Sequence, residues 1–253
     1  MANFLVHSDV RASLSLFKGS PNSPKSKKTL IETSLSYFDE VSDGRQVILP
    51  AFNYDFSRNR YFDVACDAVQ VGAIPEFARK NLSWRRNATP VFSFLGETSM
   101  LPSDNFPFSK DSVLGSLVDG GEILLFGVGF ERMTFLHFIE DQAAVPYRYK
   151  KRFEGSVKDP DGEIRQVFVE FHVRPTTLEV EYDFVQIGKF LLEEKAAVKK
   201  LHSSYLIDSK KASELLVQKL SEDALFGLSA NSRHAVEAKL DLLGRPFQLE
   251  DFE

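Results

Sequence analysis

The segment Ile123–Asp141, ILLFGVGFERMTFLHFIED, decides the fold of this 253-residue chain. Its first four residues form an uninterrupted apolar run, which is typical of a strand buried on both faces. Gly127 and Gly129 interrupt that run, and Met133–Asp141 then continues as an apolar helical segment around one imidazole, His137. The segment therefore predicts a central strand, a tight turn and a helix that carries a histidine.

Strands and helices alternate in the rest of the N-terminal half. The apolar runs predict strands at 4–6, 47–52 and 91–95. One helix is expected from Thr29, which could form a capping box with Glu32, to Asp43-Gly44. Two further helices are expected at 74–81 and 112–118. The composition of residues 18–28 predicts a loop, and the apolar residues of 53–73 show no sustained helical or strand period.

A hairpin follows Pro146. Tyr147–Lys158 and Glu163–Arg174 flank Pro160-Asp161-Gly162, in which proline presets φ and glycine takes the left-handed position. Helical segments are expected at 185–201 and 209–220. The order of elements predicts an α/β fold: a mixed central sheet flanked by helices, with an added antiparallel hairpin region.

Composition excludes several classes of function. The net charge of -5 offers no basic face for nucleic acid. No stretch approaches a membrane span, and the N-terminus lacks the pattern of a signal peptide. The single cysteine, Cys66, rules out an intrachain disulfide and fits a cytoplasmic location. The sequence leaves open whether the chain forms a homo-oligomer.

Familiar catalytic motifs are missing from the sequence. There is no GxGxxG, Walker loop or GxSxG, so dinucleotide binding, P-loop chemistry and the usual serine-hydrolase elbow lose their signatures. The five histidines show no metal-ligand spacing such as HxxxH, so we expect no metal. An unrelated hydrolase that uses His137 and Glu140 with Cys66 or a serine has no motif to support it.

His137 is the strongest candidate for catalysis. On a helix, Thr134, Glu140 and Asp141 lie on its side, and a carboxylate there would orient the ring as a general base. The alternative is a buried histidine whose ring is satisfied by Glu140 or a carbonyl, which is the commoner case for an isolated histidine.

Two helix starts could bind an anion. His7-Ser8-Asp9 closes the first strand and opens a helix, whose free N–H groups attract negative charge. The lysines at 25, 27 and 28 precede the helix start at Thr29 and could clamp a polyphosphate. Taken alone, His7-Ser8-Asp9 is better explained as a plain N-cap, and a solvated loop explains the lysines equally well.

Several segments, in order from residue 4 to about 147, together resemble the antibiotic acetyltransferase family, which includes the aminoglycoside 3-N-acetyltransferases. They are FLVHS (4–8), LPAFNYDF (49–56), GAIPE (72–76), PVFSF (90–94), and LLFGVG (124–129) followed by TFLHFIE (134–140). The resemblance implies that family's fold, as one acyltransferase domain over 1–253, with about 147–253 completing the sheet and the acceptor pocket.

The resemblance also implies an activity and its residues. The family transfers an acyl group from acyl-coenzyme A to an amine, usually on an amino sugar. By this resemblance His137 takes the place of the catalytic histidine, Glu76 that of a carboxylate at a helix start, and His7 and Ser8 contact the coenzyme. Glu76 or, from its helical spacing, Glu140 would orient the His137 ring. We further expect the coenzyme to contact Lys28, Thr29, Phe92 and Ser93, and the amino-sugar acceptor to contact Asn53, Asp55 and Glu170.

Departures from the family pattern bear on the acceptor. Phe130 stands where aminoglycoside enzymes often have a second histidine, and Thr89 where they have the histidine before proline. FERMTFLHFIE and VPYRYKK look more like family members that acylate nucleotide-linked amino sugars. The alternatives are an aminoglycoside 3-N-acetyltransferase and a coenzyme- or sugar-binding relative without catalysis.

Overall fold

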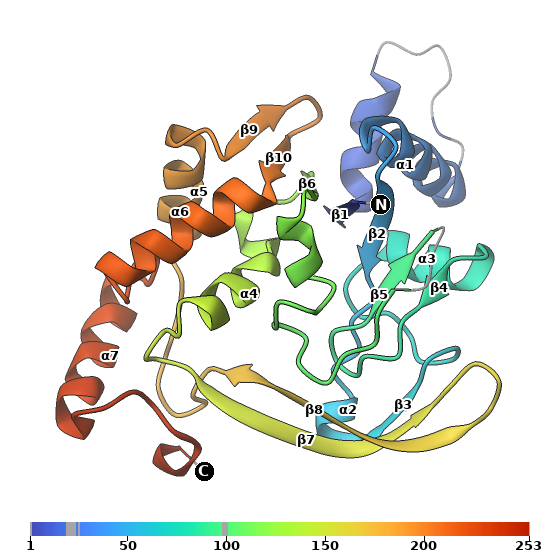
Figure 1. Cartoon of the computed structure of the whole chain (residues 1–253). Coiled ribbons are helices and arrows are strands. Elements are labelled where there is room, and N and C mark those ends of the chain that lie inside the picture. Colours follow the sequence, from blue (N-terminus) through green and yellow to red (C-terminus); the bar gives the residue numbers. More distant parts are fainter. Residues whose placement is uncertain (1, 19–23, 25, 98–100, 253) are drawn as a thin grey trace.

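A seven-stranded sheet forms the centre of the molecule (Figure 1). The computed structural model describes residues 2–18, 24, 26–97 and 101–252, so much of the expected 18–28 loop, Lys25 included, lies outside the described residues. The strand order is β4-β5-β2-β1-β6-β10-β9. The strands are β1 (Asn3–Ser8), β2 (Gln46–Pro50), β4 (Arg85–Arg86), β5 (Phe94–Gly96), β6 (Glu122–Phe126), β9 (Ala197–Lys200) and β10 (Ser204–Asp208).

The centre of this sheet is parallel and its flanks are antiparallel. β1 pairs in parallel with both β2 and β6, whereas β5, β4, β10 and β9 add antiparallel pairs. The predicted strand at 123–126 is β6, and four of its five residues are buried. The mixed α/β sheet expected from the sequence is therefore confirmed.

Helices cover both faces of the sheet. Phe4 and Val6 pack with α1 (Lys27–Val41) and α3 (Ala73–Asn81), whereas Leu5 points to the opposite face. That second face is covered by α4 (Phe135–Gln142), α5 (Phe184–Glu193) and α6 (Ser209–Glu222). α7 (Ala230–Leu243) follows α6, away from the sheet in Figure 1. Among the described residues, no helix combines the length and the apolar character needed to cross a bilayer.

The predicted hairpin forms a second, smaller sheet. β7 (Tyr149–Lys158) and β8 (Ile164–Val173) pair antiparallel from Tyr149↔Val173 to Lys158↔Ile164. β3 (Tyr61–Asp63) adds to β7 in parallel. In Figure 1 this long, curved sheet runs below α4 and β5. The segment 53–73, expected to be irregular, thus contains a strand as well as the one-turn helix α2 (Phe56–Asn59).

Several element boundaries differ from those expected. The helix predicted at 185–201 ends at Glu193, because Lys195 takes a left-handed φ of 57° and the chain then enters β9. β10 and α7 were not predicted. The predicted helix at 112–118 is a short 3₁₀ helix, η2 (Gly115–Val118), and the strand predicted at 91–95 begins only at Phe94.

Candidate active site

A cavity of about 540 Å³ opens at the ends of β1 and β2. It is lined by these two strand ends, the start of α3, the turn that leads into α4, and the side chains of Tyr54, Phe92, Tyr182 and Phe184. In open α/β sheets, ligands bind just outside the carboxyl ends of parallel strands. The cavity therefore contains the candidate active site.

His137 lies in the first turn of α4 and forms part of the cavity wall. About a third of its side chain is exposed (32%), so a ligand in the cavity can reach the ring. The rings of Phe108 and Phe92 lie 5.3 and 6.5 Å away between centroids. In the fold, the apolar residues next to His137 in the sequence lie on one side of it, and Phe92 and Phe108 lie on the other side.

Glu140 lies one helical turn after His137 and is fully buried. Its Oε2 is 3.3 Å from His137 Nδ1 and 3.0 Å from Arg148 Nε. Its Oε1 accepts hydrogen bonds from the hydroxyls of Tyr147, at 2.9 Å, and Tyr182. A buried carboxylate needs this degree of compensation.

These contacts set the charge states of the pair. Burial lowers the pKa of His137 to about 4, although the hydrogen bond with Glu140 works to raise it. Burial alone would raise the pKa of Glu140, but Arg148 and the hydrogen bond with His137 hold it well below its usual range. At neutral pH, His137 is a neutral imidazole beside an ionised carboxylate, as a general base requires.

The neighbours of Nδ1 determine which ring nitrogen of His137 is basic. Nδ1 lies 3.3 Å from both Glu140 Oε2 and Arg148 Nη2, and it cannot donate to one and accept from the other at once. We assign the proton to Nδ1, because an ionised carboxylate is the strongest acceptor within reach. Nε2 then carries the lone pair. It has no hydrogen-bond partner among the residues that the structure describes.

His172 brings a second imidazole to the same carboxylate. Its Nδ1 is 3.2 Å from Asp141 Oδ1, and its Nε2 is 3.9 Å from Glu140 Oε2. His137, Glu140 and His172 therefore offer three metal-ligand atoms within 4.8 Å of one another, a cluster that no sequence spacing predicted. The Arg148 guanidinium already supplies the compensating positive charge, and a metal dication beside it would be repelled.

His7 and Ser8 lie in the cavity wall at the end of β1. His7 is 7% exposed, and burial, assisted by the charge of Arg132, lowers its pKa to about 3. His7 Nε2 and Ser8 Oγ are buried without a hydrogen-bond partner in the described part of the chain. Asp9 then caps a 3₁₀ helix, η1 (Val10–Phe17), as the sequence suggested for a helix start.

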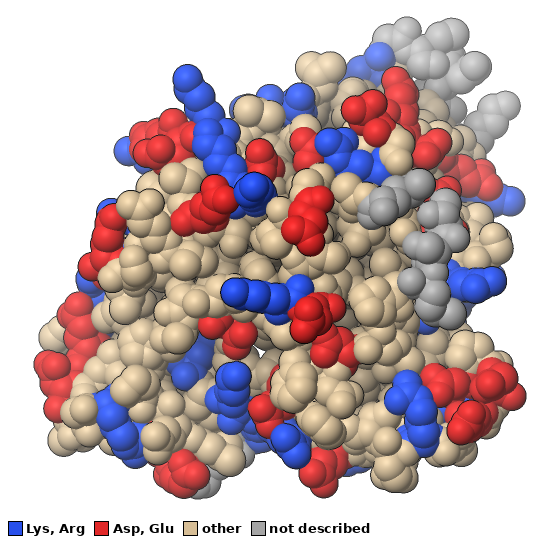
Figure 2. Space-filling view, viewed as in Figure 1, with Lys and Arg blue, Asp and Glu red and all other residues tan. Residues whose placement is uncertain are grey.

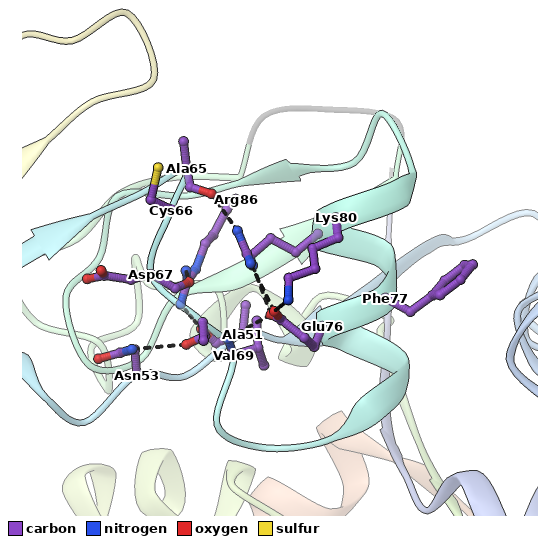
Figure 3. A network of polar contacts seen from close by, with 12 residues as sticks. Ala51, Asn53, Ala65, Cys66, Asp67, Val69, Glu76, Phe77, Lys80 and Arg86 are labelled. Carbon is purple, nitrogen blue, oxygen red and sulfur yellow. Dashed lines mark hydrogen bonds and ion pairs between the residues drawn. The ribbon is translucent and has the colours of Figure 1, made fainter. Parts of the chain in front are cut away.

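Glu76 does not orient His137. Its carboxylate accepts from Arg79 Nε at 2.8 Å and from the Val69 N–H at 2.9 Å, and it pairs with Lys80 at 2.8 Å (Figure 3). The Arg79 hydrogen bond lowers the pKa of Glu76 to about 2. Among the described residues, the polar contacts of the His137 ring are with Glu140 and Arg148, so the structure favours Glu140 over Glu76 as the carboxylate beside it. Glu76 instead ties the chain before α3 to the helix whose start lines the cavity.

Phe92 lies on the inner side of the cavity wall, and Ser93 lies behind that wall. Val91 has a left-handed φ of 67°, and the Phe92 N–H donates to Pro90 O at 2.8 Å, which makes a strained three-residue turn. This turn places Phe92 in the cavity wall. Ser93 is fully buried and bonds to Arg86 Nε at 2.9 Å, so it supports the wall from behind.

The three residues expected to bind the acceptor lie outside the cavity lining. Asn53, labelled in Figure 3, is buried and donates to Ala68 O at 2.9 Å. Asp55 is bound by Arg58 at 2.7 Å and by Gln70 at 2.9 Å. The Glu170 carboxylate pairs with the Arg152 side chain at 3.1 Å.

Lys28 and Thr29 also lie outside the cavity lining, in α1. Thr29 does not cap this helix. Ser26 is the N-cap, and its side chain accepts from the Thr29 N–H at 3.1 Å. Lys28 lies 3.7 Å from Glu32, as an exposed pair one turn apart.

Sequence reasoning missed four residues around Glu140 and one at the cavity. Arg148 and Tyr147 stand in VPYRYKK, and a buried arginine there could have been sought as a partner for a carboxylate. His172 lies on the alternating strand β8, and its inward position follows from that period. Nothing in the local sequence points to Tyr182 or to Arg132.

Comparison with known proteins agrees with this fold. A model of the family described as aminoglycoside 3-N-acetyltransferase matches residues 39–221. The apoenzyme of aminoglycoside acetyltransferase AAC(3)-IVa superposes with a TM-score of 0.64 at 19% identity, covering 94% of this chain and 89% of that one. No curated protein matches.

Two further structures share the fold. The binary complex of AAC-IIIb with CoASH has a TM-score of 0.67 at 21% identity and covers 87% of this chain and 90% of that one. YokD from Bacillus subtilis has a TM-score of 0.64 at 16% identity and covers 88% and 87%. The match over residues 39–221 shows that this chain belongs to the aminoglycoside 3-N-acetyltransferase family of enzymes, which use acyl-coenzyme A.

Proposed function

We propose that the protein transfers an acyl group from acyl-coenzyme A to the amine of a nucleotide-linked amino sugar, by direct attack in a ternary complex. The observation that carries the transfer step is the pair His137 and Glu140. A neutral imidazole, its Nδ1 fixed by a buried carboxylate, leaves Nε2 as a base at the wall of a cavity.

The transfer removes two protons from the attacking nitrogen. A primary amine is largely protonated at neutral pH, so it first loses one proton to solvent, and the neutral amine then attacks the thioester carbonyl. Nε2 of His137 accepts the second proton, which attack makes acidic, and Glu140 stabilises the imidazolium through Nδ1. Collapse of the tetrahedral intermediate expels the coenzyme thiolate, which takes a proton from the imidazolium. The products are an amide and free coenzyme A, and no covalent enzyme intermediate is needed.

The start of α3 and the end of β1 form the proposed site for the coenzyme. Gly72, at a φ of 143° that favours glycine, turns the chain into α3, so the first N–H groups of that helix lack intrahelical acceptors beside the cavity. Such groups can bind a phosphate or an oxyanion. His7 and Ser8, whose side chains each have a polar atom without a partner among the described residues, lie in the same wall. The CoASH complex of AAC-IIIb, which shares the fold, supports a coenzyme here.

The charges around the cavity favour an acceptor that is not a polycation. Its lining includes two carboxylates among the described residues, and both are engaged: Asp9 by Arg11, and Glu131 by the Gly129 N–H. Arg132 also lines the cavity, and its guanidinium has no hydrogen-bond or ion-pair partner within the described chain. On the face of the molecule shown in Figure 2, basic and acidic side chains are interspersed, without a broad acidic field. A free cation beside the cavity suits an acceptor that carries phosphate.

An aminoglycoside is the second candidate acceptor. AAC(3)-IVa, which shares the fold, has been crystallised with a gentamicin and with apramycin. The match to the aminoglycoside 3-N-acetyltransferase family also favours this acceptor.

A thiol-release assay with acetyl-coenzyme A and three acceptor groups tests the proposal. The groups are nucleotide-linked amino sugars, free amino sugars and aminoglycosides. We expect the highest kcat/KM with a nucleotide-linked sugar. A higher kcat/KM with aminoglycosides would instead identify the acceptor as an aminoglycoside, the second candidate. If coenzyme A raises the melting temperature of the protein but no amine is acylated, the protein binds the coenzyme without catalysis.

A further inference from the structure

Tyr182 connects the cavity to the buried carboxylate. Its ring lines the cavity beside Phe184, with 5.2 Å between the two ring centroids. Its hydroxyl donates to Glu140 Oε1 and accepts from Arg148 Nη2 at 2.5 Å. One phenol therefore reaches both the space for the acceptor and the group that orients the base.

Tyr147 offers an internal comparison. Its hydroxyl donates to the same oxygen, Glu140 Oε1, at 2.9 Å, but its side chain is 1% exposed and does not line the large cavity. Burial and the charge of Glu140 raise the pKa of both phenols, so both keep their protons and act as donors. The two residues share the bond to Glu140 and differ in access to the cavity.

The segment that carries Tyr182 is held firmly in place. Tyr182 forms a β-bridge with Leu228, and the Asp183 N–H donates to Gly227 O at 2.8 Å. The guanidinium carbons of Arg148 and Arg174 lie 5.8 and 5.9 Å from the centre of its ring. The exposed part of the ring is therefore a fixed surface, and such aromatic surfaces suit the C–H face of a sugar ring.

We propose that Tyr182 contacts the sugar ring of the acceptor and, through its hydroxyl, positions Glu140. Acceptor binding and the orientation of His137 are thereby coupled through one side chain. This inference rests on the proposed function, and it adds a residue that determines acceptor affinity.

Three variants separate the two roles. Tyr182→Phe and Tyr147→Phe each remove one donor from Glu140 Oε1 and keep the ring. We expect each to lower kcat about fivefold to tenfold, with the KM of the acceptor unchanged. Tyr182→Leu also removes the ring surface. We expect it to raise the KM of the acceptor about tenfold in addition, and to leave the KM of acyl-coenzyme A unchanged.

A titration of His137 by NMR tests the positioning role without turnover. In each phenylalanine variant one hydrogen bond fewer stabilises the charge of Glu140, so the carboxylate should attract a proton on His137 more strongly and the pKa of His137 should rise in both. If Tyr182→Leu folds and keeps the wild-type KM for the acceptor, the contact role is overturned. If Tyr182→Phe leaves the pKa of His137 and kcat unchanged, the positioning role is overturned. A wild-type enzyme that acylates no amine contradicts the proposed function itself, and this result would be seen before any variant is made.

Discussion

Replacing His137 by alanine should lower turnover strongly and leave the fold intact. The ring is about a third exposed, and its loss removes a single hydrogen bond from Glu140, which keeps Arg148, Tyr147 and Tyr182. We therefore expect a loss of stability of about 1 kcal/mol, or a melting temperature lower by roughly 2–4 °C. A positioned general base contributes a factor of about 10² to 10⁴ in rate, and kcat should fall by that factor.

The assay is release of coenzyme A thiol, with melting temperature measured on the same preparations. His137→Gln should behave like His137→Ala, because glutamine keeps hydrogen bonding but cannot accept the proton. His234→Ala is the matched control, since His234 is an imidazole on α7 outside the cavity lining. Coenzyme A should still raise the melting temperature of both His137 variants.

A different result would refute the catalytic role of His137. If the ring serves packing alone, His137→Ala should lose stability while turnover per folded molecule stays near the wild-type value. A stable His137→Ala enzyme with near wild-type kcat would also end the assignment.

Three further predictions concern charge. Glu140→Gln leaves Arg148 buried without its counter-ion, so urea unfolding should show a loss of about 3–5 kcal/mol; a loss below about 1 kcal/mol would contradict the buried ion pair. The pKa of His7 is about 3 in the folded protein, so the unfolded chain binds its proton more readily and stability should fall as pH drops from 6.5 towards 3. His7→Gln should flatten the melting-temperature curve over that range, and an unchanged slope would disprove the contribution. Arg132→Gln should raise the KM of a nucleotide-linked acceptor about tenfold or more and spare that of an uncharged sugar, whereas equal changes in both would remove Arg132 from phosphate recognition.

The sequence alone determined the features that depend on near neighbours. Ile123–Phe126 is apolar at every position and therefore became a strand buried on both faces of the sheet. Pro160-Asp161-Gly162 determined the hairpin through backbone preference. His137 and Glu140 are three residues apart on one helix, so helical geometry alone brings Nδ1 within 3.3 Å of the carboxylate.

The tertiary structure decided which distant residues contact His137 and Glu140. Tyr182 lies 42 residues from Glu140 in the chain, and His172 lies 31 residues from Asp141. The resemblance allowed Glu76 and Glu140 equally, and only the folded chain shows that Arg79 and Lys80 engage Glu76. Hydrogen bonds reach about 3 Å. A contact within one helical turn therefore follows from the helix itself, whereas a contact across many residues exists only after the sheet and its loops have placed both partners.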